Sequence, residues 1–203
     1  MKSRMDRMLG LARPLVHFDI RLREVLGCVA AGVIFGCFLW AVSTAIAAVA
    51  GAYLLTVMLL VTVIDSRQFL IPDVLSLPAI PLGLLYAIAA MPGSSQDILA
   101  ERLSAIAMAG GIFYAIRGIY MRLRGVEGLG LGDVKLAMAA GAWVGIAALP
   151  DTCLLAALSA LLAILIRKVM GWSPGPGMMT AVPFGSFIAP AIAAVWLYET
   201  LSS

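Results

Sequence analysis

The sequence predicts an all-α fold, a polytopic integral membrane bundle of about seven transmembrane helices with its N-terminus in the cytoplasm. Mean hydropathy over the 203 residues is +1.04, and charged residues make up 12% of the chain, about half the share in soluble domains. Apolar stretches close to the roughly 20 residues that cross a bilayer follow one another. Lys and Arg gather in alternate connections between them. These spans fill the chain, so we expect no additional soluble domain.

Charged residues and clusters of Pro and Gly divide the apolar sequence into candidate spans. The expected spans are Val25–Val42, Ala45–Ile64, Val74–Met91, Leu103–Tyr120, Val134–Leu149, Thr152–Ile166 and Ala181–Tyr198. Between the first two, only Ser43 and Thr44 indicate a turn. One helix through both would be about twice as long as the roughly 30 Å hydrocarbon core is thick. We therefore expect two spans joined by a tight hairpin, and the sequence leaves their boundary open.

The distribution of basic residues predicts the orientation. With a cytoplasmic N-terminus and seven spans, every Lys and Arg except Arg102 falls on the cytoplasmic side. Merging the first two spans would move Arg67 and the cluster Arg117–Arg124 to the side opposite the basic N-terminal segment. We expect residues 1–24 to be a cytoplasmic or interfacial segment and residues 25–203 to form a single transmembrane domain. Four tryptophans near span ends are typical of interfacial anchors: Trp40, Trp143, Trp172 and Trp196.

Two aspartates stand out because they lie at the edges of apolar runs. Asp65 ends the second span, and Asp133 closes the glycine-spaced stretch 128–133 before the fifth. A carboxylate beside a membrane span is costly and indicates a functional group. The expected topology places both at the cytoplasmic edge. Two neighbouring carboxylates tend to share one proton, so one can activate water while the other protonates a substrate carbonyl. The alternative is that Asp133 only caps a helix.

Four further residues are candidates for supporting or substrate-binding roles. Gly130 and Gly132 carry no side chain, so backbone can approach a substrate closely there. Asp73 follows Pro72 and suits the first turn of the third span, in a supporting role. Lys135 either balances charge near Asp133 or anchors the helix on the positive side.

The sequence predicts neither a metal nor a cofactor. Cys28, Cys37 and Cys153 lie inside apolar runs without a C-x-x-C pair, and His17 has no second ligand nearby. The net charge of +3 gives no indication of nucleic-acid binding. The lipid bilayer is the expected surrounding of the chain.

Three segments carry a resemblance to a known family. Residues 130–135 match a Gly-x-Gly-Asp-x-Lys signature, Asp65 is followed seven residues later by Pro72 and then by Asp73, and residues 183–185 read Pro-Phe-Gly. The chain thereby resembles the type IV prepilin (leader) peptidases, which are membrane aspartic proteases. This resemblance implies that Asp65 and Asp133 are the catalytic pair. It also implies cleavage of the short basic leader of prepilin-like proteins, after a glycine, at the cytoplasmic face of the bacterial inner membrane, in type IV pilus assembly or protein secretion.

One departure from the family pattern narrows this expectation. Longer members carry a cytoplasmic loop with paired C-x-x-C motifs and also methylate the new N-terminus, whereas this sequence has no such cysteines. The resemblance therefore implies a short, peptidase-only form without methyltransferase activity. Two other classes stay open from the residues alone. A proton- or cation-coupled transporter would use the aspartates as carriers, and a non-catalytic membrane subunit of a pilus or secretion assembly would use them only as helix caps.

Overall fold

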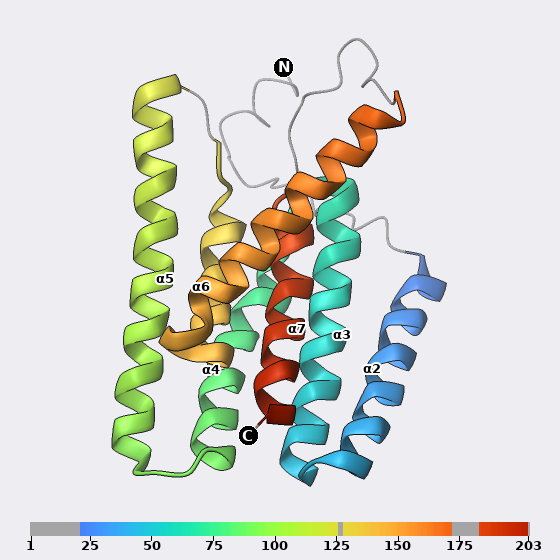
Figure 1. Ribbon diagram of the computed structural model, residues 1–203, viewed down its shortest axis with the longest axis vertical. Coiled ribbons are helices and arrows are strands. Elements are labelled where there is room, and N and C mark those ends of the chain that lie inside the picture. The colour runs from blue at the N-terminus through green and yellow to red at the C-terminus, as the bar shows by residue number, and fades with distance from the viewer. Residues whose placement is uncertain (1–20, 126–127, 172–182, 203) are drawn as a thin grey trace, which may run out of the picture.

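The computed structural model describes residues 21–125, 128–171 and 183–202, and every regular element in these ranges is an α-helix. The six helices are α2 (Leu22–Val42), α3 (Ala45–Gln68), α4 (Asp73–Ala90), α5 (Ser95–Arg124), α6 (Leu131–Val169) and α7 (Gly185–Ser202), arranged as a bundle (Figure 1). Most of the expected N-terminal segment, together with His17 and Trp172, lies outside the described residues. An all-helical bundle is confirmed.

The hairpin between the first two expected spans is present. α2 ends at Val42 and α3 begins at Ala45. The Thr44 hydroxyl accepts a hydrogen bond from the backbone N–H of Ala47 at 3.2 Å, so it caps α3 and separates it from α2. A single capping side chain therefore divides an otherwise continuous apolar run.

The fifth and sixth expected spans differ from the prediction, because α6 covers both. The break was expected between Leu149 and Thr152, but the helix instead changes direction at Gly145, where φ is 75° and ψ is −179°. Figure 1 shows α6 turning back on itself there. Glycine takes this conformation without a Cβ clash. The Glu101 carboxylate of α5 accepts the Ile146 N–H at 2.7 Å, which satisfies a backbone donor that the kink exposes.

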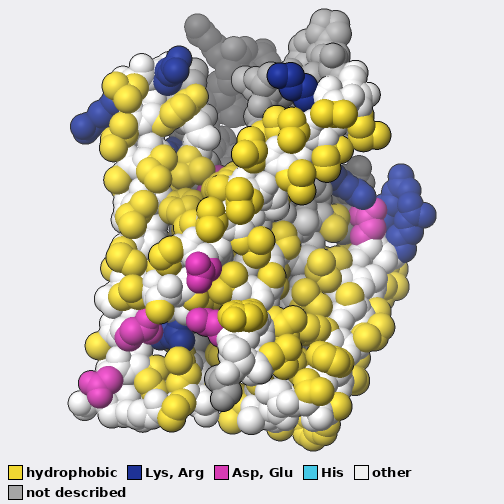
Figure 2. All heavy atoms as spheres, in the orientation of Figure 1, with side chains coloured by type: hydrophobic (Ala, Val, Ile, Leu, Met, Phe, Trp, Pro, Cys, Tyr) yellow, Lys and Arg dark blue, Asp and Glu magenta, His cyan; other side chains and the backbone are white. Residues whose placement is uncertain are grey.

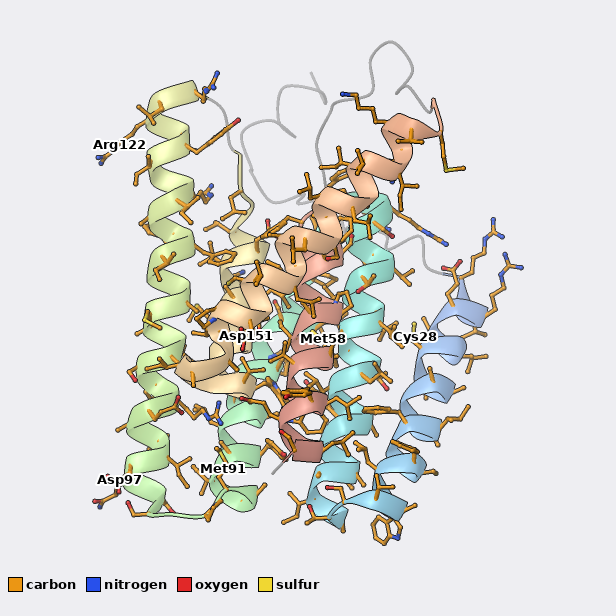
Figure 3. The ribbon with its side chains drawn as sticks, in the orientation of Figure 1. Cys28, Met58, Met91, Asp97, Arg122 and Asp151 are labelled. Carbon is orange, nitrogen blue, oxygen red and sulfur yellow. The ribbon has the colours of Figure 1, made fainter. Side chains whose placement is uncertain are left out.

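α5 is longer than the expected span Leu103–Tyr120. Its extra N-terminal turns begin after Ser94, whose hydroxyl accepts the Asp97 N–H at 3.2 Å and donates to the Asp97 carboxylate at 2.6 Å. The polar residues at which the expected span was cut therefore form a capped helix start. Figure 3 shows Asp97 at one end of α5 and Arg122 near the other.

The packing is that of a membrane protein. Five helices, α2 to α6, are long and apolar enough to cross a bilayer, and their outward faces expose many large aliphatic side chains (Figure 2). The buried core contains many alanines, which allow helices to approach closely, as is usual between membrane helices. The chain is therefore a multi-pass helical membrane protein.

Two of the four tryptophans are buried inside the bundle, whereas interfacial anchors would face the lipid. Trp143 and Trp196 are each 2% exposed, and their rings meet edge to face at 6.0 Å inside the bundle. The Trp143 indole N–H donates to the Ala79 carbonyl of α4 at 2.8 Å. Position near a span end therefore misled the prediction, because burial is decided by which helix face the side chain occupies.

Candidate active site

The two aspartates lie at the same end of the bundle. Asp65 is in the last turn of α3 and Asp133 is in the first turn of α6, and these helix ends lie toward the top of Figure 1. Their exposed fractions are 4% and 9%. The two carboxyl groups are close enough to interact electrostatically. The structure thus brings together two residues that are far apart in sequence.

Asp65 also joins two helices. Its Oδ2 accepts hydrogen bonds from the backbone N–H of Ser186 at 2.6 Å and from the Ser186 hydroxyl at 3.0 Å. Ser186 lies in the first turn of α7, where backbone N–H groups have no partner within the helix. α3 ends at Gln68, just beyond Asp65, and the next residue, Phe69, adopts a left-handed conformation with φ of 51°. Asp65, at the end of α3, therefore accepts a hydrogen bond from a backbone N–H at the N-terminus of α7.

Asp133 is less fully bonded. Its Oδ2 accepts the Gly130 N–H at 3.1 Å, within the turn that starts α6. Its Oδ1 is buried and has no hydrogen-bond partner among the described residues. An unpaired buried oxygen is rare in folded proteins and calls for a functional or structural explanation. This oxygen is available to hydrogen-bond a water molecule, a shared proton or a substrate.

Ile71 packs between two glycines beside the aspartates. A Cβ at Gly132 would lie 2.8 Å from the Ile71 Cβ. A Cβ at Gly185 would lie 2.6 Å from the Ile71 Cδ1 and 2.9 Å from the Asp65 Oδ2. Both glycines therefore allow a close approach that any larger residue would disturb. The missing side chain at Gly132 accommodates Ile71, and its expected role in substrate binding or support stays a prediction.

The remaining predicted residues lie around this pair. Gly130 is the N-cap of α6 and donates its N–H to Asp133. Lys135 forms an ion pair with Asp73 at 2.6 Å, which ties α6 to the first residue of α4. The Asp73 side chain is 58% exposed, so this pair lies at the protein surface and Asp73 is not buried with the two aspartates. The Arg117 Nε donates to the Leu129 carbonyl at 3.1 Å and so fixes the segment that leads into α6.

Two contact residues had no role assigned from the sequence. Ile71 lies in a segment that carried the family resemblance and Ser186 directly follows another, and that was the only signal pointing to them. Their contacts with Asp65, Gly132 and Gly185 join separate helices, so the sequence could not reveal them. Ser186 lies 121 positions from Asp65.

Metal chemistry has no evident site in the part of the chain that the structure describes. No group of three or more His, Cys, Asp and Glu side chains there could hold a metal ion. The arrangement instead offers two interacting carboxyl groups, one of them with an unpaired oxygen. Such a pair can share a proton and act together as general base and general acid.

Comparison with known proteins identifies the family. The model of the type IV leader peptidase family matches residues 52–166, a range that contains both Asp65 and Asp133. The prepilin leader peptidase/N-methyltransferase of Burkholderia pseudomallei is 34% identical over 155 residues, covering 76% of this chain and 48% of the relative. Its counterpart in Pseudomonas aeruginosa is 34% identical over 152 residues, covering 72% and 50%.

Another relative is closer in length. The leader peptidase HopD of Escherichia coli is 35% identical over 127 residues, covering 63% of this chain and 78% of the relative. The chain spans about half the length of the prepilin leader peptidase/N-methyltransferases that it matches. No solved structure matches it. The family match across more than half of the residues, with both aspartates inside it, shows that this chain belongs to the type IV leader peptidase family.

Proposed function

We propose that the chain is a membrane aspartic endopeptidase that removes the short basic leader from type IV prepilin-like membrane proteins. Asp65 and Asp133 are the catalytic pair in this proposal. The observation that carries it is the placement of two buried carboxyl groups, close enough to interact electrostatically, at one end of a membrane bundle. Both lie in the range matched by the family. Membrane interiors seldom hold such acids without a functional reason.

The chemistry follows from the sharing of one proton. The charged carboxylate takes a proton from a water molecule, and the water oxygen attacks the carbonyl carbon of the scissile peptide bond. The protonated carboxyl gives its proton to the carbonyl oxygen, so that a neutral tetrahedral intermediate forms. The carboxyl that took the proton from water then gives it to the leaving nitrogen as the C–N bond breaks, and a hydroxyl of the intermediate returns its proton to the other carboxylate. The products are a carboxylic acid and an amine, and the pair again holds one proton. Asp133 Oδ1, which has no protein partner among the described residues, is the acceptor best suited to contact the water.

The proposed orientation places this site at the cytoplasmic face of the bacterial inner membrane. Seven crossings result if α7 also crosses and the two segments of α6 on either side of Gly145 each span the bilayer. Lys and Arg side chains on the face shown in Figure 2 gather toward its upper end, with one lower exception. Arg122 lies at that end of α5, whereas Met91 and Asp97 lie at the opposite end (Figure 3). This asymmetry supports a cytoplasmic N-terminus and a cytoplasmic site.

The supporting residues have proposed roles that match their contacts. Gly130 orients Asp133 through its N–H, and Gly132 lets Ile71 pack beside the pair. The ion pair between Lys135 and Asp73 holds the start of α6 against α4. Residues 25–203 form one transmembrane peptidase domain in this proposal. It cleaves the leader but does not methylate the new N-terminus.

The deciding experiment compares leader removal by the unchanged chain and by single variants. A prepilin-like substrate is co-expressed in a bacterial host lacking its own leader peptidase, and loss of the leader is read as a mass change. Asp65→Asn and Asp133→Asn should each abolish cleavage, because an amide can neither accept the proton of water nor share one. Both proteins should still be found in the membrane fraction.

Two other aspartates provide matched controls. Asp73→Asn breaks only the surface ion pair with Lys135, and Asp151→Asn changes an exposed residue of α6, so both should retain at least partial activity. Full cleavage by Asp65→Asn or Asp133→Asn would overturn the catalytic assignment of that residue. Mass analysis of the new N-terminus tests the second point, because an added methyl group would contradict a peptidase-only activity.

A further inference from the structure

An apolar cavity of about 170 Å³ lies between α5, α6 and α7. Its lining includes Met108 and Ile112 of α5, Ala137, Ala140 and Cys153 of α6, and Phe184, the residue before α7. Ile112 and Cys153 are exposed on the outer surface of the bundle, so the cavity adjoins the face that meets lipid. We call this cavity the apolar groove.

The apolar groove continues from the proposed catalytic pair. Ala137 and Ala140 follow Asp133 by four and seven residues, so all three occupy the same face of α6. These two alanines of the lining therefore lie about 6 and about 10 Å along the helix from Asp133, at about 1.5 Å per residue. On the other side, Phe184 immediately precedes Gly185, whose neighbour Ser186 bonds Asp65. One surface thus leads from both aspartates into the groove.

The lining determines what the groove can bind. Apart from the Cys153 thiol, a weak donor, its polar side chain is that of Thr152, whose hydroxyl already donates to the Ala148 carbonyl at 2.9 Å. An occupant with an unsatisfied polar group would therefore be disfavoured. The wall is also held in place, since the rings of Phe113 and Phe184 stack at 6.4 Å. The volume is that of a single large side chain and is too small for a helix.

The proposed reaction defines which part of the substrate passes this surface. A basic leader stays on the cytoplasmic side, so the chain that follows the scissile bond is the part that enters the bilayer. Within lipid that segment must be helical and apolar, because its backbone groups have no other partners. Starting at the aspartates, it runs in the direction of the groove.

We propose that the apolar groove is a specificity subsite for one large apolar side chain of the substrate's membrane segment. This subsite rests on the proposed function. A helical substrate rising about 1.5 Å per residue would place its residue about four to seven positions after the scissile bond at the groove. The subsite holds the substrate in register, so that the scissile bond meets the two carboxyl groups.

The test first fills the groove with a larger side chain of the protein. It then replaces one large side chain of the substrate by a smaller one, which should restore cleavage. Ile112→Trp places a bulky side chain in the groove, and Ile116→Trp is the matched control, because both isoleucines are 50% exposed on α5 and only Ile112 lines the groove. A second pair guards against misfolding: Cys153→Trp fills the groove from α6, and Cys37→Trp is its control on α2. Purified variants and a prepilin-like substrate are reconstituted in lipid vesicles, and kcat and KM for leader removal are measured.

The groove-filling variants should lower kcat/KM by about tenfold or more, chiefly through KM, while both controls stay within about twofold of the unchanged chain. Replacing large apolar residues of the substrate by Ala, one at a time from positions four to seven, should identify one position that weakens cleavage by the unchanged chain. The same replacement should improve cleavage by the filled variants. Equal cleavage by filled and control variants would overturn the subsite alone. Absence of cleavage by the unchanged chain would overturn the proposed function and the subsite with it.

Discussion

At the scale of single residues, the two aspartates are bonded unequally. Asp65 Oδ2 accepts two hydrogen bonds from Ser186, whereas Asp133 Oδ1 has no partner among the described residues. Each aspartate also contributes to a helix end, Asp65 at α7 and Asp133 at α6. Capping therefore accounts for part of the geometry without any catalysis. The unpaired buried oxygen is what capping leaves unexplained, and it favours the enzymatic proposal.

Ser186 bonds Asp65, so removing its hydroxyl should slow the proposed reaction. Ser186→Ala deletes the 3.0 Å hydrogen bond and leaves the backbone N–H in place. A hydrogen bond between neutral groups contributes about 0.5–1.5 kcal/mol, which corresponds to a fall in kcat of about 2- to 12-fold with little change in KM. Steady-state kinetics of leader removal measures both constants, and the pH profile of kcat should shift as well.

Ser159→Ala is the control for this prediction, since the Ser159 hydroxyl bonds only the Ala156 carbonyl of its own helix. Ser186→Thr keeps the hydroxyl and should recover most of the activity. A kcat for Ser186→Ala equal to that of the Ser159 control would show that the hydroxyl does not position Asp65.

The proposed sharing of one proton between Asp65 and Asp133 predicts the pH dependence of cleavage. Activity should fall at high pH, when the shared proton is lost, and at low pH, when a second proton is gained. The two limbs of this bell-shaped curve belong to the pair and not to either residue. Initial rates across the pH range, with chemistry shown to be rate-limiting, provide the measurement. A rate that is flat through both limbs would argue against a shared proton.

At the scale of helices, the kink at Gly145 gives α6 two directions. Glu101 accepts the Ile146 N–H and lies 3.1 Å from the Arg102 Nε, so the start of α5 supports the kink. Arg102 is 4% exposed and packs directly against Gly145. The Glu101 side chain is 42% exposed, and a partly exposed charge pair contributes little stability by itself, so its position beside the kink is better explained by geometry. The second segment of α6 can then cross in front of α7 and α3 (Figure 1).

Gly145→Ala should destabilise the protein. A side chain at this φ is strained by about 1–3 kcal/mol, and the new Cβ would also clash with the Arg102 guanidinium. Thermal unfolding in detergent should show a lower transition temperature. Gly111→Ala is the matched control, because a Cβ there meets nothing within 4 Å and alanine favours the interior of α5. A transition temperature no lower than that of the Gly111 variant would mean that the kink does not depend on glycine.

At the scale of the whole molecule, the two ends of the bundle differ in their charged residues. The end with Asp65 and Asp133 also carries the basic ends of α5 and α6, whereas the opposite end carries the Ser94 cap and Asp97 of α5. The lipid-facing sides between them are aliphatic (Figure 2). This arrangement suits a site that receives a water-soluble leader at one membrane face and an apolar segment from the bilayer.

Topology reporters test this arrangement directly. With a cytoplasmic N-terminus and seven crossings, a reporter fused after Ser202 should be active in the periplasm, and one inserted after Arg124 should be active in the cytoplasm. Paired alkaline phosphatase and green fluorescent protein fusions at each position give opposite readouts and check each other. The reverse pattern at both positions would overturn the orientation and the cytoplasmic placement of the site.

The sequence by itself determined the helical membrane class, the division between α2 and α3 and the family. Each of these depends on local pattern: apolar length, the Thr44 cap and short motifs around Asp65 and Asp133. These signals lie within a few residues of one another, so they can be read along the chain. The same local reasoning placed the break between the fifth and sixth spans at Pro150, because proline and charge usually interrupt helices.

Only the tertiary structure decided where α6 bends and how the site is held. The bend at Gly145 depends on an acceptor from α5, and the bonds to Asp65 come from α7, 121 positions away. Ile71 fits between Gly132 and Gly185 only once three segments have packed together. Trp143 and Trp196 are buried because their helix faces point at each other. Such contacts join residues with no local relation in the sequence, so they exist only in the folded bundle.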